Sequence, residues 1–166
     1  MMRNNAPNNA LFLFLSALVI ALDQYSKHLV VLSLPHYSVQ ALLPHLNLVH
    51  LHNTGAAFSM FREAPALAFV GLAAAVAAGI LAWLRKHPAG ERFTAAGLCL
   101  ILGGAVGNVI DRLRIGHVTD FIDFYVGDRH FAAFNIADAA ISVGAGLLIL
   151  EMLLETLRSK TAMGQP

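Results

Sequence analysis

Two aspartates, Asp120 and Asp138, are the residues in this sequence best suited to catalysis. They come from different elements, since Asp120 lies in a strand-like segment and Asp138 lies near the start of an apolar stretch, so they could face each other across a cleft. Two close carboxylates cannot both ionise cheaply, and such a pair therefore holds a single proton. The charged carboxylate can activate water while the protonated one donates to a carbonyl oxygen, which is the chemistry of an aspartic peptidase. Spacing alone leaves open that both are ordinary surface acids.

A second set of polar residues falls inside otherwise apolar stretches, where a charge costs at least about 2.5–3.5 kcal/mol. Asp23 and Lys27 are four residues apart, so they share a helix face and can pair. That pair is either a salt bridge that permits membrane insertion or a group on the substrate side. Asn108, Asp111 and Arg112 also share a face. Asp111 beside Arg112 could support a site or could be only a helix-end ion pair.

Asparagines and glycines complete the candidate site. Asn135 precedes Asp138 by three residues, so both side chains can point into a helix bundle. Asn53 begins a turn signal. Gly103 and Gly107 have the four-residue spacing of small residues that lets membrane helices approach closely.

Metal and nucleotide chemistry find little support in the sequence. His50 and His52 are two residues apart and His117 lies three before Asp120, but neither spacing matches a specific zinc pattern. No phosphate loop, dinucleotide fingerprint or nucleophile elbow occurs, so we expect no metal and no cofactor. The formal charge of +1 gives no argument for a nucleic-acid partner, and the single cysteine, Cys99, is expected to pack among apolar neighbours.

The composition points to a bilayer as the main solvent of the chain. Of its 166 residues, 57% are hydrophobic and 13% are charged, against roughly 25% charged in a soluble domain, and the mean hydropathy is +0.64. A spanning helix needs about 20 mostly apolar residues, and four stretches meet or approach that length. We therefore predict a single domain over residues 1–166, an all-α membrane protein with four transmembrane helices and a small extracytoplasmic sheet. The helices should cover approximately residues 10–34, 65–84, 93–111 and 134–154.

The first apolar stretch could be mistaken for a cleavable signal peptide, because Arg3 precedes it. The apolar run resumes over Leu29–Leu34, however, after the polar segment Asp23–His28. Signal peptides do not continue in this way, so we expect a retained helix.

The distribution of basic residues predicts the orientation, because Lys and Arg prefer the cytoplasmic side. The compact basic loop Arg85–Arg92, which joins two spans, decides the assignment and places both termini in the cytoplasm. The segments at about Pro35–Ala64 and Arg112–Ala133 then face outward, and the polar residues named above fall at this outer depth. Val118–Tyr125 has the composition of a strand and Leu46–His52 is a weaker candidate, so a small sheet should lie at the outer membrane surface.

Five blocks of this sequence resemble the lipoprotein signal peptidase (signal peptidase II) family, in order and at the expected spacing over nearly the whole chain. These blocks are Asp23–Lys27, Asn53–Ser59, Gly103–Arg112, Gly116–Phe121 and Phe134–Ile141. The termini and Glu63–Leu102 share only an apolar or variable character with the family.

The resemblance implies a four-helix peptidase of the bacterial cytoplasmic (inner) membrane, with its active site near the extracytoplasmic face. The implied catalytic residues are Asp120 and Asp138. The implied lining or bracing residues are Asn53, Asn108, Arg112 and Asn135, with Asp23, Lys27 and Asp111 in support. The implied substrate is a prolipoprotein, cleaved just before a cysteine that carries diacylglycerol. Membrane lipids and cyclic peptide inhibitors of the globomycin type are the other implied partners.

Two other classes of protein remain open on the residues alone. A small proton- or ion-coupled transporter would also carry carboxylates inside its spans. Four spans without an inverted repeat, however, are unlike most such folds. A non-catalytic membrane subunit would leave the clustered acids unexplained.

Overall fold

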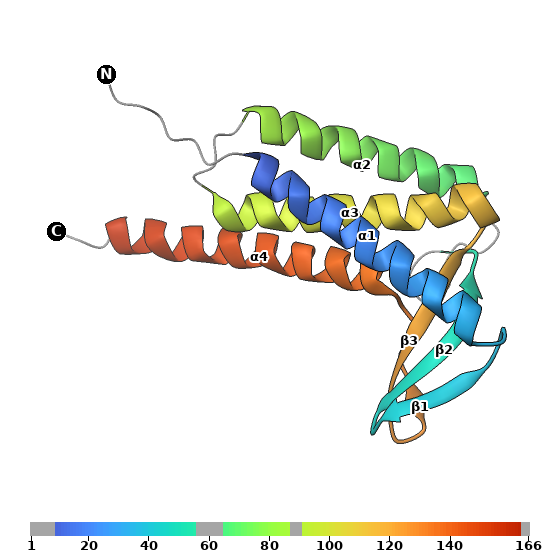
Figure 1. Cartoon of the computed structure of the whole chain (residues 1–166). Coiled ribbons are helices and arrows are strands. Elements are labelled where there is room, and N and C mark those ends of the chain that lie inside the picture. Colours follow the sequence, from blue (N-terminus) through green and yellow to red (C-terminus); the bar gives the residue numbers. More distant parts are fainter. Residues whose placement is uncertain (1–8, 56–64, 87–90, 164–166) are drawn as a thin grey trace.

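The computed structural model describes residues 9–55, 65–86 and 91–163, which form four long helices and one small sheet (Figure 1). Each helix is long and apolar enough to cross a bilayer. The predicted four-span architecture is therefore confirmed, and the chain is a multi-pass membrane protein. The helices are α1 (Asn9–Ser33), α2 (Ala66–Lys86), α3 (Arg92–Ile115) and α4 (Ile136–Met163).

Some of the predicted features lie outside the described residues. These are Arg3, residues 56–59 of the second resemblance block, and residues 87–90 at the centre of the basic loop.

Helices α3 and α4 run well past their predicted ends. Helix α3 continues to Ile115 rather than to residue 111, and it stops at Gly116, whose φ of 79° is left-handed. Helix α4 continues to Met163 rather than to residue 154, because its polar last turns contain no Gly or Pro. Apolar content marks the part of a helix that can lie in lipid, whereas caps and helix propensity set where the backbone helix stops.

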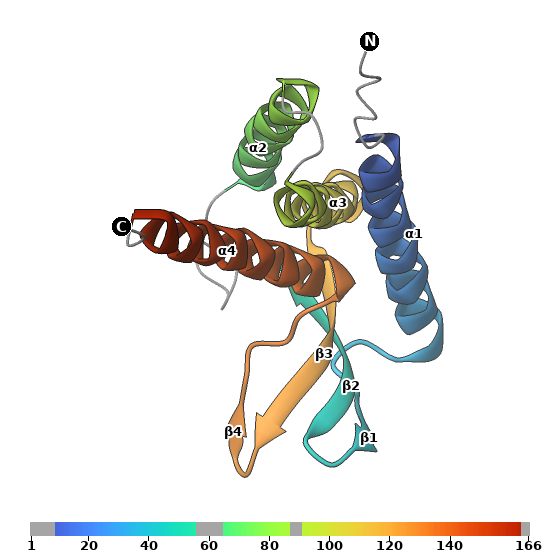
Figure 2. The same ribbon diagram turned by 90° about the vertical axis from the view of Figure 1, so that its left-hand side faces the viewer.

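Helix α3 lies at the centre of the bundle and packs against α1, α2 and α4 (Figure 2). Glycines permit this close packing. A Cβ on Gly103 would lie 2.8 Å from the carbonyl oxygen of Ser16 in α1, and a Cβ on Gly107 would lie 2.7 Å from a carboxylate oxygen of α1. A Cβ on Gly104 would collide with the backbone carbonyl of Ala137 in α4. The close helix approach predicted at Gly103 and Gly107 is thus confirmed.

The bundle has a small apolar core and an apolar outer surface. Cys99 is fully buried beside Ile80, Leu84 and Leu102, so its predicted packing role is confirmed. Long apolar side chains face outward along all four helices, among them Leu11, Phe14, Leu67, Phe93 and Leu153. Exposed apolar surface of this extent suits lipid as the surrounding medium.

An antiparallel sheet projects from one end of the bundle (Figure 1). Strands β2 and β3 match the two predicted strands. The sequence does not predict β1 and β4, because β1 is exposed along its whole length, without alternation, and β4 has only two residues. In spatial order the strands are β1 (Val39–Leu43), β2 (Leu46–Asn53), β3 (Val118–Val126) and β4 (Arg129–His130).

The pairing of β2 with β3 joins two segments that are far apart in the chain. Asn53 is the register partner of Val118, and Leu51 is the partner of Asp120. The segment before α2 and the segment after α3 are therefore held together, and their ends meet at the end of the helix bundle.

Candidate active site

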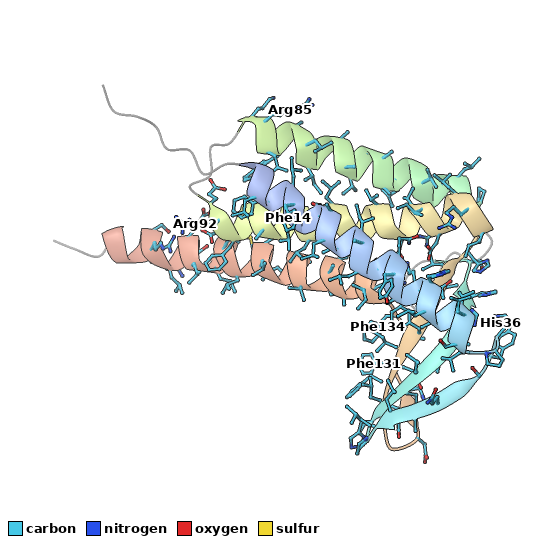
Figure 3. The ribbon with its side chains drawn as sticks, in the orientation of Figure 1. Phe14, His36, Arg85, Arg92, Phe131 and Phe134 are labelled. Carbon is cyan, nitrogen blue, oxygen red and sulfur yellow. The ribbon has the colours of Figure 1, made fainter. Side chains whose placement is uncertain are left out.

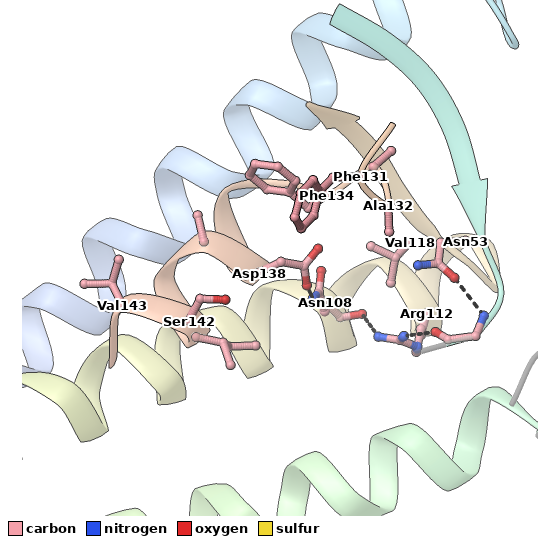
Figure 4. Close-up of a pocket in the computed structure, with 14 residues that line it drawn as sticks. Asn53, Asn108, Arg112, Val118, Phe131, Ala132, Phe134, Asp138, Ser142 and Val143 are labelled. Atoms are coloured by element: carbon pink, nitrogen blue, oxygen red, sulfur yellow. Dashed lines mark hydrogen bonds between the residues drawn. The ribbon is translucent and has the colours of Figure 1, made fainter. Parts of the chain in front are cut away.

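A cavity of about 620 Å³ opens where α3 and α4 meet the sheet (Figure 4). Asp138 lines it beside Asn108, and most of the remaining lining is apolar. Asp120 is 3% exposed and is not among the lining residues. Its hydrogen-bond partner Asn53 does line the cavity. One aspartate thus faces the cavity directly, and the other lies behind an amide that does.

Asp138 is fixed by the start of its own helix. Because α4 begins at Ile136, Asn135 occupies the N-cap position and Asp138 the third helical position. Asn135 Oδ1 accepts the Asp138 N–H at 3.0 Å, and Asp138 Oδ2 accepts the Asn135 N–H at 3.3 Å. This reciprocal pair is a capping box, with Asp in the place usually taken by Glu or Gln. Asp138 Oδ1 remains available and accepts the Asn108 amide at 2.7 Å.

Asp120 receives an amide donor on each carboxylate oxygen. Asn135 Nδ2 donates to Oδ1 at 2.8 Å, and Asn53 Nδ2 donates to Oδ2 at 2.9 Å. The orientation of the Asn53 amide is set by its own turn, since Asn53 Oδ1 accepts the Gly55 N–H at 3.0 Å. Asn135 therefore contacts both aspartates.

The acidity of Asp120 reflects two opposing effects. Burial and the nearby charge of Asp138 raise the pKa of Asp120 from 3.8 to about 7. The bonds from Asn53 and Asn135 act in the opposite direction, because amide donors favour the charged form. The net result is a carboxyl group that can gain or lose a proton near neutral pH.

Lys27 connects helix α1 to this site. Its ammonium contacts Asp23 Oδ2 at 2.8 Å, Asp111 Oδ2 at 2.9 Å and Asn108 Oδ1 at 2.9 Å, so all three of its donors are used. Because Asn108 Oδ1 accepts from a cation, its Nδ2 must point the other way, toward Asp138. The predicted pairing of Asp23 with Lys27 is present, and the pair also orients an amide at the cavity.

The two acids around Lys27 tie further elements to the network. Asp23 Oδ1 accepts the Ala137 N–H of α4 at 2.9 Å, and Asp111 Oδ2 accepts the Thr119 N–H of β3 at 3.2 Å. Gln24 Nε2 donates to Asp111 Oδ1 at 2.8 Å. Neither Gln24 nor Thr119 is predicted from the sequence. Gln24 could have been found as a polar residue beside Asp23 in an apolar stretch, whereas Thr119 contributes only its backbone and carries no sequence signal.

Arg112 lies at the rim of the cavity. Its guanidinium donates to the Gly55 carbonyl at 2.7 Å and to the Asn108 carbonyl at 3.4 Å, and it stacks 4.7 Å from the ring centroid of Phe69. The salt-bridge partner of Asp111 is on α1, so the alternative of a helix-end ion pair between Asp111 and Arg112 is wrong.

The structure brings every predicted site residue into one connected network at the sheet end of the bundle. Within the described ranges, no group of three or more His, Cys, Asp or Glu side chains is placed to hold a metal ion. The chemistry available at the cavity is therefore that of two carboxylates and the amides and cation that orient them.

Fold and site together define a multi-pass membrane protein that holds a buried and a half-buried carboxylate beside an apolar cavity. The sequence profile of signal peptidase (SPase) II matches residues 15–154. The chain therefore belongs to the signal peptidase II family, and its class is that of a membrane peptidase.

Relatives and solved structures agree with this assignment. The lipoprotein signal peptidase of Alteromonas mediterranea is 45% identical over 144 residues, which cover 85% of this chain and 79% of that protein. The lipoprotein signal peptidase of Coxiella burnetii is 48% identical over 148 residues, covering 86% and 90%. A bacterial membrane enzyme solved at 2.3 Å by the in meso method is similar with a TM-score of 0.82 and 28% identity, over 89% of this chain and 90% of that one. These similarities give no support to the transporter alternative.

Proposed function

We propose that this chain is an aspartic endopeptidase that removes the signal peptide from prolipoproteins, with Asp120 and Asp138 as its catalytic residues. The observation that carries the proposal is the position of Asn135. Its side-chain nitrogen binds Asp120 while its backbone and side-chain oxygen form the capping box with Asp138. One residue thus keeps a buried acid and a half-buried acid in fixed positions, from elements that are separate in the chain.

A shared proton is the expected state of such a pair. The pKa of Asp120, raised to about 7 by burial and by Asp138, supports a state with one proton between the two carboxyl groups near neutral pH. The protonation steps belong to the pair rather than to either residue alone. Amide donors from Asn53, Asn108 and Asn135 stabilise the remaining charge without supplying a competing proton.

The proposed reaction uses water as the nucleophile. The charged carboxylate takes a proton from water as the water oxygen bonds to the scissile carbonyl carbon, and the protonated carboxyl gives its proton to the carbonyl oxygen. The C–N bond of the tetrahedral intermediate then breaks, and the leaving amine receives a proton from the pair. One hydroxyl group of the intermediate gives its proton to the other carboxylate as the carbonyl re-forms, so the pair again holds one proton. Neither Asp120 nor Asp138 bonds to the substrate, so no covalent intermediate forms.

The cavity suits a substrate that arrives from the lipid. Its apolar lining includes Val118, Phe131, Phe134 and Val143, and Asp138 lies among them (Figure 4). A signal peptide is itself an apolar helix, so its scissile end can enter this lining while the acyl chains on its modified cysteine stay in the bilayer. Cleavage is proposed just before that cysteine. Membrane lipids and globomycin-type cyclic peptides are the other proposed occupants of this region.

The proposed location is the bacterial cytoplasmic membrane, with both termini cytoplasmic and the sheet end outside. Water must reach the scissile bond, which supports a site near the interface rather than at the middle of the bilayer. Asp120 lies in β3 and Asp138 in the first turn of α4, which begins beside the sheet (Figure 1), and this supports a site near the interface.

The test uses the purified full chain in detergent, mixed with a diacylglyceryl-modified prolipoprotein. We expect release of the intact signal peptide, with the new N-terminus at the modified cysteine. The same precursor without the lipid serves as the control and should be cleaved much more slowly. A chain that is folded but leaves the lipidated precursor uncut would overturn the proposal.

A further inference from the structure

Four histidine rings meet at the sheet end of the molecule, and we call them the histidine cluster: His36, His50, His52 and His117. They come from three segments. His36 follows α1, His50 and His52 project from the same face of β2, and His117 precedes β3. The ring of His52 stacks between those of His36 and His117, with centroids 3.7 Å away on each side. His50 meets His36 and His52 edge-on, at 5.3 Å in both cases.

His50 ties the cluster to the end of α1. It is 5% exposed, and its Nδ1 lies 2.9 Å from the Leu34 carbonyl at the end of α1. A carbonyl oxygen can only accept, so Nδ1 carries a proton. The Nε2 atom is buried and has no hydrogen-bond partner in the part of the chain that the structure describes.

The stacked rings of the histidine cluster resist protonation, because each ring faces another ring that can carry the same positive charge. Partial burial and the neighbouring His117, His36 and His50 lower the pKa of His52 from 6.5 to about 4. Burial likewise lowers the pKa of His117. His52 still reaches solvent, so its close stacking on two imidazoles carries more of the argument than its burial does.

Little nearby charge offsets this repulsion. The groups of α3 that favour the charged form of His117 are the backbone carbonyl of Ile115 and the carboxylate of Asp111. Asp111 already forms an ion pair with Lys27. From the segment after α1, the neighbour of His36 is the ring of Tyr37, at 3.9 Å between centroids. Among the described residues, the contacts around the cluster thus supply one carboxylate, and that carboxylate is already paired.

The cluster adjoins the proposed active site through the backbone. His52 immediately precedes Asn53, which donates to Asp120. His117 immediately precedes Val118, the register partner of Asn53 and the first residue of the strand that carries Asp120. Movement of the stacked rings would therefore act on the cross-strand pair that leads directly into the site.

We propose that the histidine cluster is a proton-sensitive clasp that positions Asn53 and Asp120. Neutral, it holds the end of α1, strand β2 and the start of β3 together. Protonated, its rings repel one another, and the strand ends that carry the two site residues loosen. The positioning role rests on the proposed function, whereas the clasp itself does not. The cluster residues are positioning residues and touch no substrate.

The sign of the pH effect follows from which state binds more protons. Between about pH 4 and 6.5 the unfolded chain protonates a histidine that the folded cluster keeps neutral. The stability contributed by the neutral clasp is therefore complete above pH 6.5 and is lost as the pH falls toward 4.

The first test compares unfolding midpoints of the full chain in detergent at about pH 7.5 and about pH 5, on either side of the ordinary histidine pKa. All proteins carry Asp120→Asn and Asp138→Asn, so that the site carboxylates do not titrate. We expect the midpoint of this parent to fall on acidification by about 3 °C or more. The variant that also carries His52→Gln and His117→Gln should lose most of this fall, whereas His28→Gln, a change at an exposed α1 histidine, should keep it. An equal fall in all three proteins would overturn the clasp.

A second measurement keeps the proposal testable if the double histidine variant does not fold. NMR titration of the histidine ring protons in the parent should show rings that remain neutral at about pH 5, where an ordinary histidine is charged. His36→Gln, which removes the exposed end of the stack, should raise the pKa of the remaining His52. Ordinary titration of every histidine in the parent would overturn the clasp.

The positioning role needs the active enzyme. With wild-type aspartates, the cleavage rate should fall more between about pH 7 and about pH 5 in the wild type than in His52→Gln with His117→Gln, and His28→Gln should follow the wild type. Equal falls would overturn the positioning role. An enzyme that cleaves at no pH would count against the proposed function instead, and the midpoint comparison would still decide the clasp.

Discussion

At the scale of single residues, Asn135 performs three tasks that usually fall to separate groups. Its side-chain oxygen caps α4, its backbone N–H binds Asp138, and its side-chain nitrogen binds Asp120. Ser, Thr and Asp cap helices as well as Asn does, but none of them also offers a side-chain N–H donor. The combination of an N-cap with an amide donor explains why an asparagine suits this position.

The paired action of the aspartates leads to a substitution test. Asp120→Asn and Asp138→Asn each keep the side-chain shape but remove the shared charge and proton. We expect each single change to abolish measurable cleavage and the double change to be little worse, because residues that act as a unit lose their effect together. The measurement is signal peptide release by purified, membrane-inserted variants.

The matched control for this test is Asp128→Asn, at an exposed position in the turn between β3 and β4. Asp123 in β3 is unsuitable as a control, because the residue is 7% exposed and its side chain is hydrogen-bonded to Asn47 and His130. Near-normal turnover by either Asp120→Asn or Asp138→Asn would show that the aspartic mechanism is wrong.

The raised pKa of Asp120 predicts how cleavage depends on pH. The active pair holds one proton, so activity should fall as the pH rises through about 7 and that proton is lost. Each further pH unit should cost about tenfold in rate. The Asn53 amide lowers the pKa of Asp120 by binding its charged form, so Asn53→Ala should move this alkaline fall to higher pH. Rate profiles of the two proteins with one lipidated substrate give the comparison, and identical alkaline limbs would contradict the assignment.

At the scale of elements, Lys27 is the point at which three helices and a strand depend on one charge. It neutralises the acids that bind the start of α4 and the start of β3. Lys27→Met would leave two buried carboxylates without a cation, which typically costs about 3–5 kcal/mol of unfolding free energy. Lys160→Met, at an exposed position near the end of α4, should change the unfolding free energy little. Denaturant unfolding in detergent checks both, and equal stability of the two variants would remove Lys27 from its central position.

The contact between α3 and α4 gives a second prediction at this scale. A Cβ on Gly104 would collide with the backbone of Ala137, one residue before Asp138. Gly104→Ala should therefore push the first turn of α4 outward, cost about 1–3 kcal/mol in unfolding free energy and lower the cleavage rate. On α4, a Cβ at Gly146 meets nothing within 4 Å, so Gly146→Ala should preserve the rate and leave stability equal or slightly higher. A rate unchanged in Gly104→Ala would mean that the position of this turn does not control the site.

The elements also show how far sequence alone can predict this molecule. The spans follow from apolar length, and the site residues follow from polar types at unexpected depths and from the family resemblance. Strand β1 could not be predicted, because an exposed edge has no alternating pattern. The bond from Lys27 to Asn108 joins residues 81 positions apart, so no local spacing reveals it. Spacing likewise left open whether Asp111 supports the site or only pairs with its neighbour Arg112, and packing places Asp111 against Lys27 of α1.

At the scale of the whole molecule, the two ends differ in chemistry. The sheet, the buried polar network and the cavity lie at one end, whereas the start of α1 and the end of α4 lie toward the other (Figure 1). Figure 3 shows Arg85 and Arg92 at the end away from His36, Phe131 and Phe134. Of the basic residues at the sheet end, Lys27 is buried and paired with two acids. Lys27 therefore adds no accessible positive charge at the sheet end. The excess of accessible positive charge lies at the end of the bundle with Arg85 and Arg92.

This asymmetry predicts the orientation in the membrane, because accessible Lys and Arg favour the cytoplasmic side. A cysteine placed at Gln40, exposed on β1, should react with a membrane-impermeant thiol reagent added outside intact cells whose outer membrane has been permeabilised. A cysteine placed at Glu91, exposed before α3, should react only after the inner membrane is opened. The wild type supplies the blank, since its single cysteine, Cys99, is fully buried. Labelling of the Glu91 position but not the Gln40 position in intact cells would show the reverse orientation. The aspartates would then lie at the cytoplasmic face, where the proposed substrate does not present its modified cysteine.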